Sequence, residues 1–154
     1  MGLKQLRAFL KSHRKVALDT TVFIYQLEAH PRYLELTDAI FAWVEELGHA
    51  AVTPTITMLE LLVWPYRDSS ERREDEFYAL LTTYPNLVWL ALDLELADLA
   101  ARIRAAHRLR TPDAVQAACA IRAEATGLIT NDPVFERVEG FETLVLDRLL
   151  DGAG

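Results

Sequence analysis

The chain has 154 residues, of which 51% are hydrophobic, and this favours one domain over residues 1–154 with a substantial core. The composition excludes a disordered or collagen-like chain, and the single cysteine, Cys119, excludes an intrachain disulfide and a cysteine-based zinc site. The formal net charge of −7 argues at first sight against a nucleic-acid partner. The sequence shows no signal-peptide core and no apolar run of membrane-spanning length, which predicts a cytoplasmic protein.

The first half of the chain alternates between helical and strand patterns. Apolar residues at helical spacing predict an opening helix that carries Leu3, Leu6, Phe9 and Leu10. The following elements are predicted in order: a strand over 15–20, helices over 21–30 and 32–47, a strand over 49–53, and helices over 53–66 and 69–83.

The second half continues the alternation. Asp93 is a good N-cap for a helix that runs to about His107, and Thr111 is expected to cap a helix that runs to Gly127. The other predicted elements are strands over 87–92, 127–131 and 141–146, and a short helix or turn over 132–138. Strands that alternate with helices predict an α/β fold around a parallel sheet.

Four acidic residues each stand in a stretch that contains no other charged residue: Asp19, Glu60, Asp113 and Asp132. A carboxylate in apolar surroundings costs several kcal/mol unless it is paired, protonated or bound to a metal. Asp19 and Asp132 lie at the ends of predicted strands, and ligands of parallel sheets gather at the carboxyl ends of strands. We therefore expect one shared site that binds a divalent cation, and such binding would weaken the objection from net charge.

The residue types at this site indicate which metals it would bind. Carboxylates without accompanying Cys or His favour Mg2+ or Mn2+, and one or two such ions can activate water for phosphodiester hydrolysis. Each aspartate also has an ordinary structural explanation, as a turn residue or as an acid at a helix start. Glu60 has the weakest such explanation, since it points along an apolar helical face.

Four stretches of the sequence together resemble a PIN-domain nuclease: VALDTTVFIY (16–25), TITMLELLVWPYR (55–67), LRTPDAVQAACA (109–120) and GLITNDPVF (127–135). They are similar in particular to the toxin half of bacterial and archaeal VapBC-type toxin–antitoxin pairs. The resemblance implies a PIN-like three-layer sandwich, in which helices flank a central five-stranded parallel sheet. It further implies a Mg2+- or Mn2+-dependent endoribonuclease, an antitoxin partner and a homodimer.

The resemblance also assigns roles to residues. It implies that Asp19, Glu60, Asp113 and Asp132 are the catalytic metal ligands, and it leaves open whether Asp132 binds directly or through water. Thr20 and Asn131 match supporting positions of the family. Many relatives carry His where this chain has Gln116. Independently of the family, Arg110 adjoins Asp113 and is the best candidate for a contact with substrate phosphate.

Two other functions remain open from the residues. A magnesium-dependent phosphatase or phosphotransferase of another α/β family is disfavoured, because no second acid lies two residues after Asp19 and no Gly-rich phosphate-binding motif occurs. A non-catalytic RNA-binding module with the same fold is the other alternative. Neither the RNA target nor the number of metal ions follows from the sequence.

Overall fold

A computed structural model describes residues 2–68 and 71–151. Its centre is one five-stranded sheet in the order β3-β2-β1-β4-β5, and all four strand pairings are parallel. The strands are β1 (Lys15–Leu18), β2 (Ala50–Pro54), β3 (Leu87–Leu90), β4 (Gly127–Thr130) and β5 (Glu142–Val145). The predicted α/β class and five-stranded parallel sheet are therefore confirmed.

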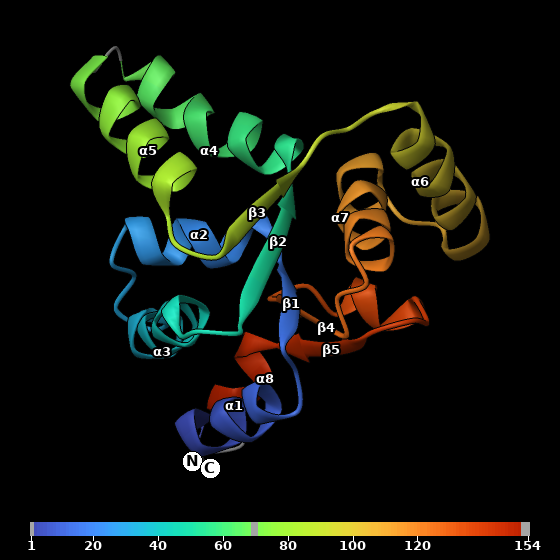
Figure 1. Cartoon of the computed structure of the whole chain (residues 1–154), viewed down its shortest axis with the longest axis horizontal. Coiled ribbons are helices and arrows are strands. Elements are labelled where there is room, and N and C mark those ends of the chain that lie inside the picture. Colours follow the sequence, from blue (N-terminus) through green and yellow to red (C-terminus); the bar gives the residue numbers. More distant parts are fainter. Residues whose placement is uncertain (1, 69–70, 152–154) are drawn as a thin grey trace.

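Helices connect the strands and cover both faces of the sheet (Figure 1). They are α1 (Gly2–Lys11), α2 (Thr20–Leu27), α3 (Leu34–Glu45), α4 (Thr55–Arg67), α5 (Glu71–Thr83), α6 (Leu94–His107), α7 (Thr111–Arg122), the 3-10 helix η1 (Pro133–Arg137) and α8 (Leu146–Asp151). Among the residues described, no helix is both long and apolar enough to span a membrane.

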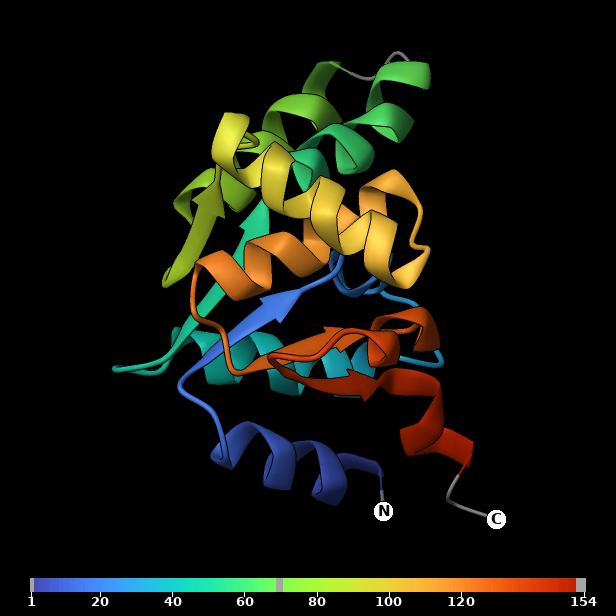
Figure 2. The same cartoon turned by 90° about the vertical axis from the view of Figure 1, so that its right-hand side faces the viewer.

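Alternate residues of the strands point into two separate cores. In β1, Val16 and Leu18 pack into the core that contains α1, α2 and α3, whereas Ala17 packs into the core that contains α6 and α7. This alternation is the period of two that a strand imposes on its side chains. It produces three layers, with α6 and α7 on one side of the strands and α1 on the other (Figure 2).

Several predicted boundaries are wrong. Strand β1 ends at Leu18, so Asp19 is the N-cap of α2 and not a strand residue. Arg110, rather than Thr111, is the extended N-cap residue of α7, and no side chain caps that helix. Helix α7 ends at Arg122 because Glu124 adopts a left-handed φ of 58°, which stops the helix before Gly127.

Two further predictions concern where an element begins or ends. The strand predicted over 141–146 ends at Val145, and Leu146 begins α8. Ser69, the predicted start of a helix, lies outside the described residues, and α5 begins at Glu71.

Helix α1 packs closely against the start of β4. A Cβ at Gly127 would lie 2.8 Å from the Phe9 ring and 3.1 Å from the His13 ring, so only glycine leaves room for this contact. The apolar side of α1 contributes Leu6, Phe9 and Leu10 to the core. Gly127 therefore allows α1 to cover the sheet.

We expect Gly127→Ala to lower the free energy of unfolding by about 1–3 kcal/mol, because the added methyl group overpacks the junction with Phe9. Urea unfolding followed by circular dichroism measures this change. Phe9→Leu in the same background shortens the opposing side chain and should recover part of the loss. An unfolding free energy unchanged by Gly127→Ala would contradict the close packing.

Candidate acidic site

The four predicted acids come from four separate elements near one edge of the sheet. Asp19 follows β1, Asp132 lies two residues after β4, Asp113 is in the first turn of α7, and Glu60 is within α4. The charges of Asp113 and Glu60 both raise the pKa of Asp19, and the charge of Asp132 raises that of Asp113. Each acid is therefore near enough to another to repel it.

Asp19 is the buried centre of this group, with 8% of its surface exposed. Its Oδ1 accepts a hydrogen bond from the Thr20 backbone N–H at 2.8 Å, and its Oδ2 accepts one from the Thr130 hydroxyl at 2.7 Å. Burial raises its pKa to about 6, assisted by the charges of Asp113 and Glu60 and opposed by the two hydrogen bonds. A bound cation would relieve this unfavourable environment.

Asp113 is less buried, with 13% of its side chain exposed. Burial is the main cause that raises the pKa of Asp113, and Asp132 adds to it, whereas the nearby Arg110 lowers it. Arg110 Nε lies 3.4 Å from Asp113 Oδ2, and the arginine side chain is 80% exposed. Such an exposed pair contributes little to stability, so Arg110 can exchange this carboxylate for another anion at small cost.

Glu60 differs from the expectation of an apolar setting, because it is exposed to solvent. One carboxylate oxygen accepts a hydrogen bond from the Thr20 hydroxyl at 3.0 Å. Thr20 therefore contacts Asp19 through its backbone and Glu60 through its side chain. Thr20 thus links two of the four acids, and its supporting role in a metal site stays a prediction.

A buried polar network, which the sequence analysis does not predict, lies behind Thr20. The Gln116 amide donates to the Thr20 hydroxyl at 3.2 Å and to the Thr57 hydroxyl at 2.8 Å, and Thr57 in turn bonds with Thr53 at 2.6 Å. The predicted site residues do not include Gln116. A polar residue within the apolar run AVQAACA, one turn after Asp113, was the available signal.

Asn131 and Asp132 lie in the turn that follows β4. The Asn131 amide donates to the hydroxyls of Tyr25 at 2.9 Å and Tyr33 at 3.1 Å, and its oxygen accepts from the Asp147 backbone at 2.8 Å. These bonds tie the turn to three other segments, so Asn131 orders the turn that carries Asp132. Asp132 Oδ1 accepts from the Val134 backbone at 3.0 Å, which caps η1.

The donor set fits a hard divalent cation, since it consists of carboxylate oxygens with threonine hydroxyls beside them. Over residues 2–68 and 71–151, no three His, Cys, Asp or Glu side chains are close enough together to hold a metal ion in common. Binding therefore requires side-chain movement, for which exposed Glu60 and partly exposed Asp132 have room. Buried Asp19 is the fixed point of the arrangement.

The fold and the acidic group together define an α/β protein with carboxylates at the carboxyl edge of a parallel sheet. The chain matches the PIN domain family over residues 16–140, and it belongs to that family, which is a family of nucleases. No curated protein matches the chain.

Solved structures with a similar fold each cover 85% of the chain. A toxin–antitoxin complex from Klebsiella pneumoniae is 18% identical, with a TM-score of 0.65 over 85% of this chain and 97% of that one. VapBC2 from Rickettsia felis, bound to a DNA fragment from its promoter, is 14% identical, with a TM-score of 0.66 over 85% and 98%. FitAcB from Neisseria gonorrhoeae is 17% identical, with a TM-score of 0.62 over 85% and 97%. At these identities the likeness establishes the fold.

Proposed function

We propose that the protein is a Mg2+- or Mn2+-dependent endoribonuclease and the toxin of a toxin–antitoxin pair. The observation that carries this proposal is the environment of Asp19 in a chain of the PIN family. Its carboxylate is buried, and the charges of Asp113 and Glu60 reach it at the carboxyl edge of the sheet. Such a cluster is unfavourable unless a cation is present, and it is suited to binding one.

In this proposal Asp19, Asp113 and Glu60 hold the metal, and Asp132 contributes directly or through water. A bound ion supplies activation of a water molecule and stabilisation of the leaving oxygen. Thr130 and Thr20 hold Asp19 in one orientation, since each donates to a different carboxylate oxygen. Arg110 leaves Asp113 to contact a phosphate of the RNA, which positions the backbone beside the acids.

The proposed partners follow from the solved relatives and from the surface. The relatives described above include toxin–antitoxin complexes, and we propose an antitoxin and a homodimer for this chain as well. Large apolar side chains are exposed on α4 and α5: Leu59, Trp64, Tyr66, Tyr78 and Leu80. Exposed apolar surface of this kind is typical of protein interfaces. We further propose that residues 1–154 act as one domain and that the protein works in the cytoplasm.

Two alternatives have less support. Membership of the PIN family argues against a phosphatase of another α/β family. A non-catalytic RNA-binding module would have no need of a buried acid with a raised pKa, and all four predicted acids are present.

The direct test is incubation of the purified protein with single-stranded and structured RNAs in Mn2+, in Mg2+ and in EDTA. We expect cleavage within the chain only when a metal is present, and 5′-phosphate and 3′-hydroxyl ends on the products. A small phosphate monoester serves as the control substrate. Cleavage that persists in EDTA, or turnover of the monoester without cleavage of RNA, would overturn the proposal.

A further inference from the structure

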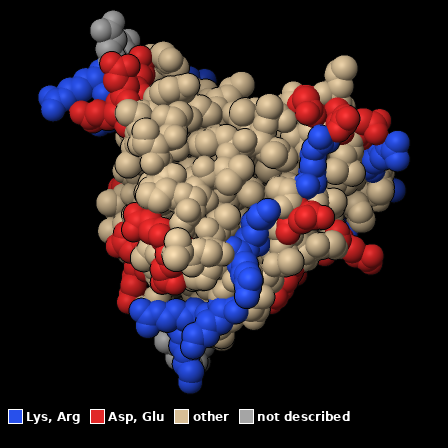
Figure 3. Space-filling model, viewed as in Figure 1, with Lys and Arg blue, Asp and Glu red and all other residues tan. Residues whose placement is uncertain are grey.

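Helix α1 lies outside the residues matched by the PIN family, and its exposed face carries only positive charge. Residues 2–18 contain no Asp or Glu, although the whole chain has a net charge of −7. The exposed cations of this segment are Lys4, Arg7, Lys11 and Arg14, which we call the α1 basic face. Lys and Arg side chains gather at the lower end of the molecule in Figure 3, where α1 lies in Figure 1.

The members of the α1 basic face lack the acidic partners that several other surface cations have. Arg72 pairs with Glu76 at 3.0 Å, and Arg102 pairs with Asp98 at 3.0 Å. Within the part of the chain that the structure describes, no ion pair with Asp or Glu involves any of the four cations of the α1 basic face. Their charge is therefore available to an anionic ligand.

A membrane surface is not the partner that this helix fits. Interfacial helices bury their apolar side in the lipid, but the apolar side of α1 is already in the protein core. Leu6 is fully buried, and Phe9 and Leu10 are nearly so. Only the charged side remains for an external contact, and an anion with distributed negative charge suits it.

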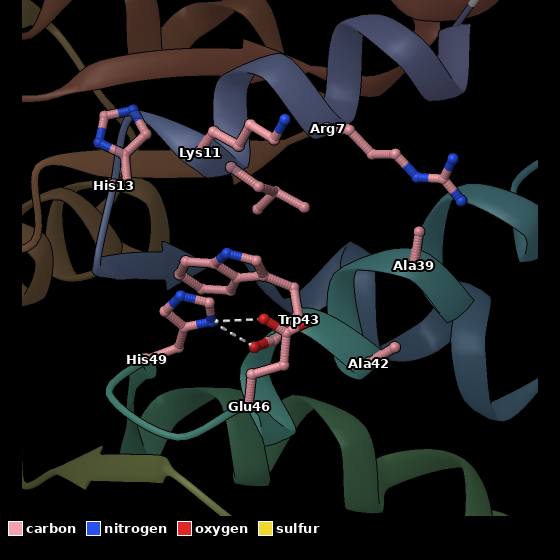
Figure 4. Close-up of a pocket in the computed structure, with 9 residues that line it drawn as sticks. Arg7, Lys11, His13, Ala39, Ala42, Trp43, Glu46 and His49 are labelled. Atoms are coloured by element: carbon pink, nitrogen blue, oxygen red, sulfur yellow. Dashed lines mark hydrogen bonds and ion pairs between the residues drawn. The ribbon is translucent and has the colours of Figure 1, made fainter.

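A cavity of about 450 Å³ lies between α1 and α3, directly beside the α1 basic face. Figure 4 shows Arg7 and Lys11 on one side of it and the stacked rings of Trp43 and His49 on the other. The two ring centroids are 4.1 Å apart with an angle of 14° between the planes. His49 Nδ1 lies 2.8 Å from the Trp43 carbonyl oxygen and 3.5 Å from a Glu46 carboxylate oxygen, which fixes the ring.

The lining of the cavity suits an unpaired nucleobase, and its volume leaves ample room for one. Cavities of a few hundred Å³ with apolar walls and a few polar groups accept small organic ligands. Proteins recognise single-stranded RNA by holding unstacked bases beside aromatic side chains, with cations along the backbone. A base of a duplex remains stacked and could not enter.

We propose that the α1 basic face and this cavity bind single-stranded RNA, with the phosphates against Arg7 and Lys11 and one unpaired base in the cavity. The inference rests on the proposed ribonuclease function. Helix α1 precedes β1, whereas Asp19 follows it, so the surface lies at the opposite end of β1 from the acids. Four strand residues span about 13 Å, so the bound RNA must extend around the protein to reach the acids. The surface therefore anchors the substrate and takes no part in hydrolysis.

The test is the affinity of the full chain for a short unstructured RNA, measured by fluorescence anisotropy in EDTA from about 50 to about 200 mM salt. Arg7→Gln with Lys11→Gln removes two cations of the surface, and Arg72→Gln with Arg102→Gln is the control with the same change of charge. We expect the first pair to weaken binding at least about tenfold at low salt. It should also reduce the slope of log K against log salt by about 1.4, the value for two phosphate contacts on a single strand.

Several outcomes would overturn the inference. These are unchanged affinity and slope, an equal loss in the control pair, and equally tight binding of duplex DNA. Loss of affinity for an antitoxin with RNA binding intact would assign the surface to a protein partner instead. Because binding is measured in EDTA, the result stands apart from cleavage. If the wild type cleaves RNA with a metal but Arg7→Gln with Lys11→Gln leaves RNA binding unchanged, only this inference is wrong. If the wild type does not cleave RNA, only the proposed activity is wrong.

Discussion

Asp19→Asn is expected to reduce RNA cleavage at least about hundredfold and, at the same time, to make the protein more stable in the absence of added metal. Activity falls because asparagine provides a neutral oxygen where the proposed metal site needs a carboxylate. Stability rises because the buried carboxylate has a pKa of about 6 in the folded protein instead of its ordinary 3.8. This difference corresponds to at most about 3 kcal/mol of destabilisation near neutral pH.

Asparagine can retain both hydrogen bonds of Asp19. Its oxygen can accept from the Thr20 backbone, and its amide can donate to the Thr130 hydroxyl, which would then act as acceptor. Thermal unfolding in EDTA measures the stability gain, for which we expect a Tm several degrees higher. Asp98→Asn is the matched control, since Asp98 is an exposed acid paired with Arg102. It should change stability by less than about 0.5 kcal/mol and leave cleavage intact.

The combination of effects separates two roles for Asp19. Lower activity with higher stability identifies a residue that is held in an unfavourable environment for function. Lower activity with lower stability would mean that Asp19 mainly supports the fold through its hydrogen bonds. Full activity in Asp19→Asn would remove it from the proposed ligand set.

The second large effect is the loss of metal binding in mild acid. Metal binding requires ionised carboxylates, and Asp19, with a pKa of about 6, takes up a proton as pH falls from 7 to 5. Burial also raises the pKa of Asp113. We therefore expect the affinity for Mn2+ to be at least about tenfold lower at pH 5 than at pH 7. Calorimetric titration at the two values measures it, and equal affinities would show that the site does not depend on Asp19.

The same shift predicts the opposite trend for stability in EDTA. Between pH 3.8 and about 6 the folded state holds a proton on Asp19 that the unfolded chain releases. The contribution of Asp19 to stability is therefore highest below this range and is lost as pH rises through it. Other carboxylates follow their own trends, so the measured quantity is the difference in unfolding free energy between wild type and Asp19→Asn. Parallel pH profiles for the two proteins would contradict the raised pKa.

The sequence was sufficient to predict the features that rest on local patterns. The alternation of strands and helices predicted the parallel sheet, and the position of Asp19 after an apolar run located it at the carboxyl edge. Its isolation from other charges predicted an unusual environment, and in the structure Asp19 is buried, with 8% of its surface exposed. Isolation from other charges did not predict the environment of Glu60. Helix α4 is only partly covered by the rest of the protein, so the Glu60 side chain is exposed to solvent.

Hydrogen bonds between residues far apart in the sequence, and the exact ends of helices, could not be predicted from local patterns. Thr130 lies 111 residues from Asp19, and Gln116 lies 96 residues from Thr20, so no local pattern links these hydrogen-bonded pairs. The prediction that Thr111 caps α7 was wrong because the residue with extended backbone before the helix is Arg110. The end of α7 depends on a left-handed Glu124, a conformation that its residue type does not favour.

A crystal grown with Mn2+ tests whether the acids from four elements form one metal site. We expect an anomalous difference peak within coordination distance of the carboxylates of Asp19 and Asp113, with Glu60 turned toward it. The same peak should be absent from crystals of Asp19→Asn. A fully occupied peak elsewhere on the protein, or no peak beside Asp19 at saturating Mn2+ and pH 7, would contradict a shared metal site.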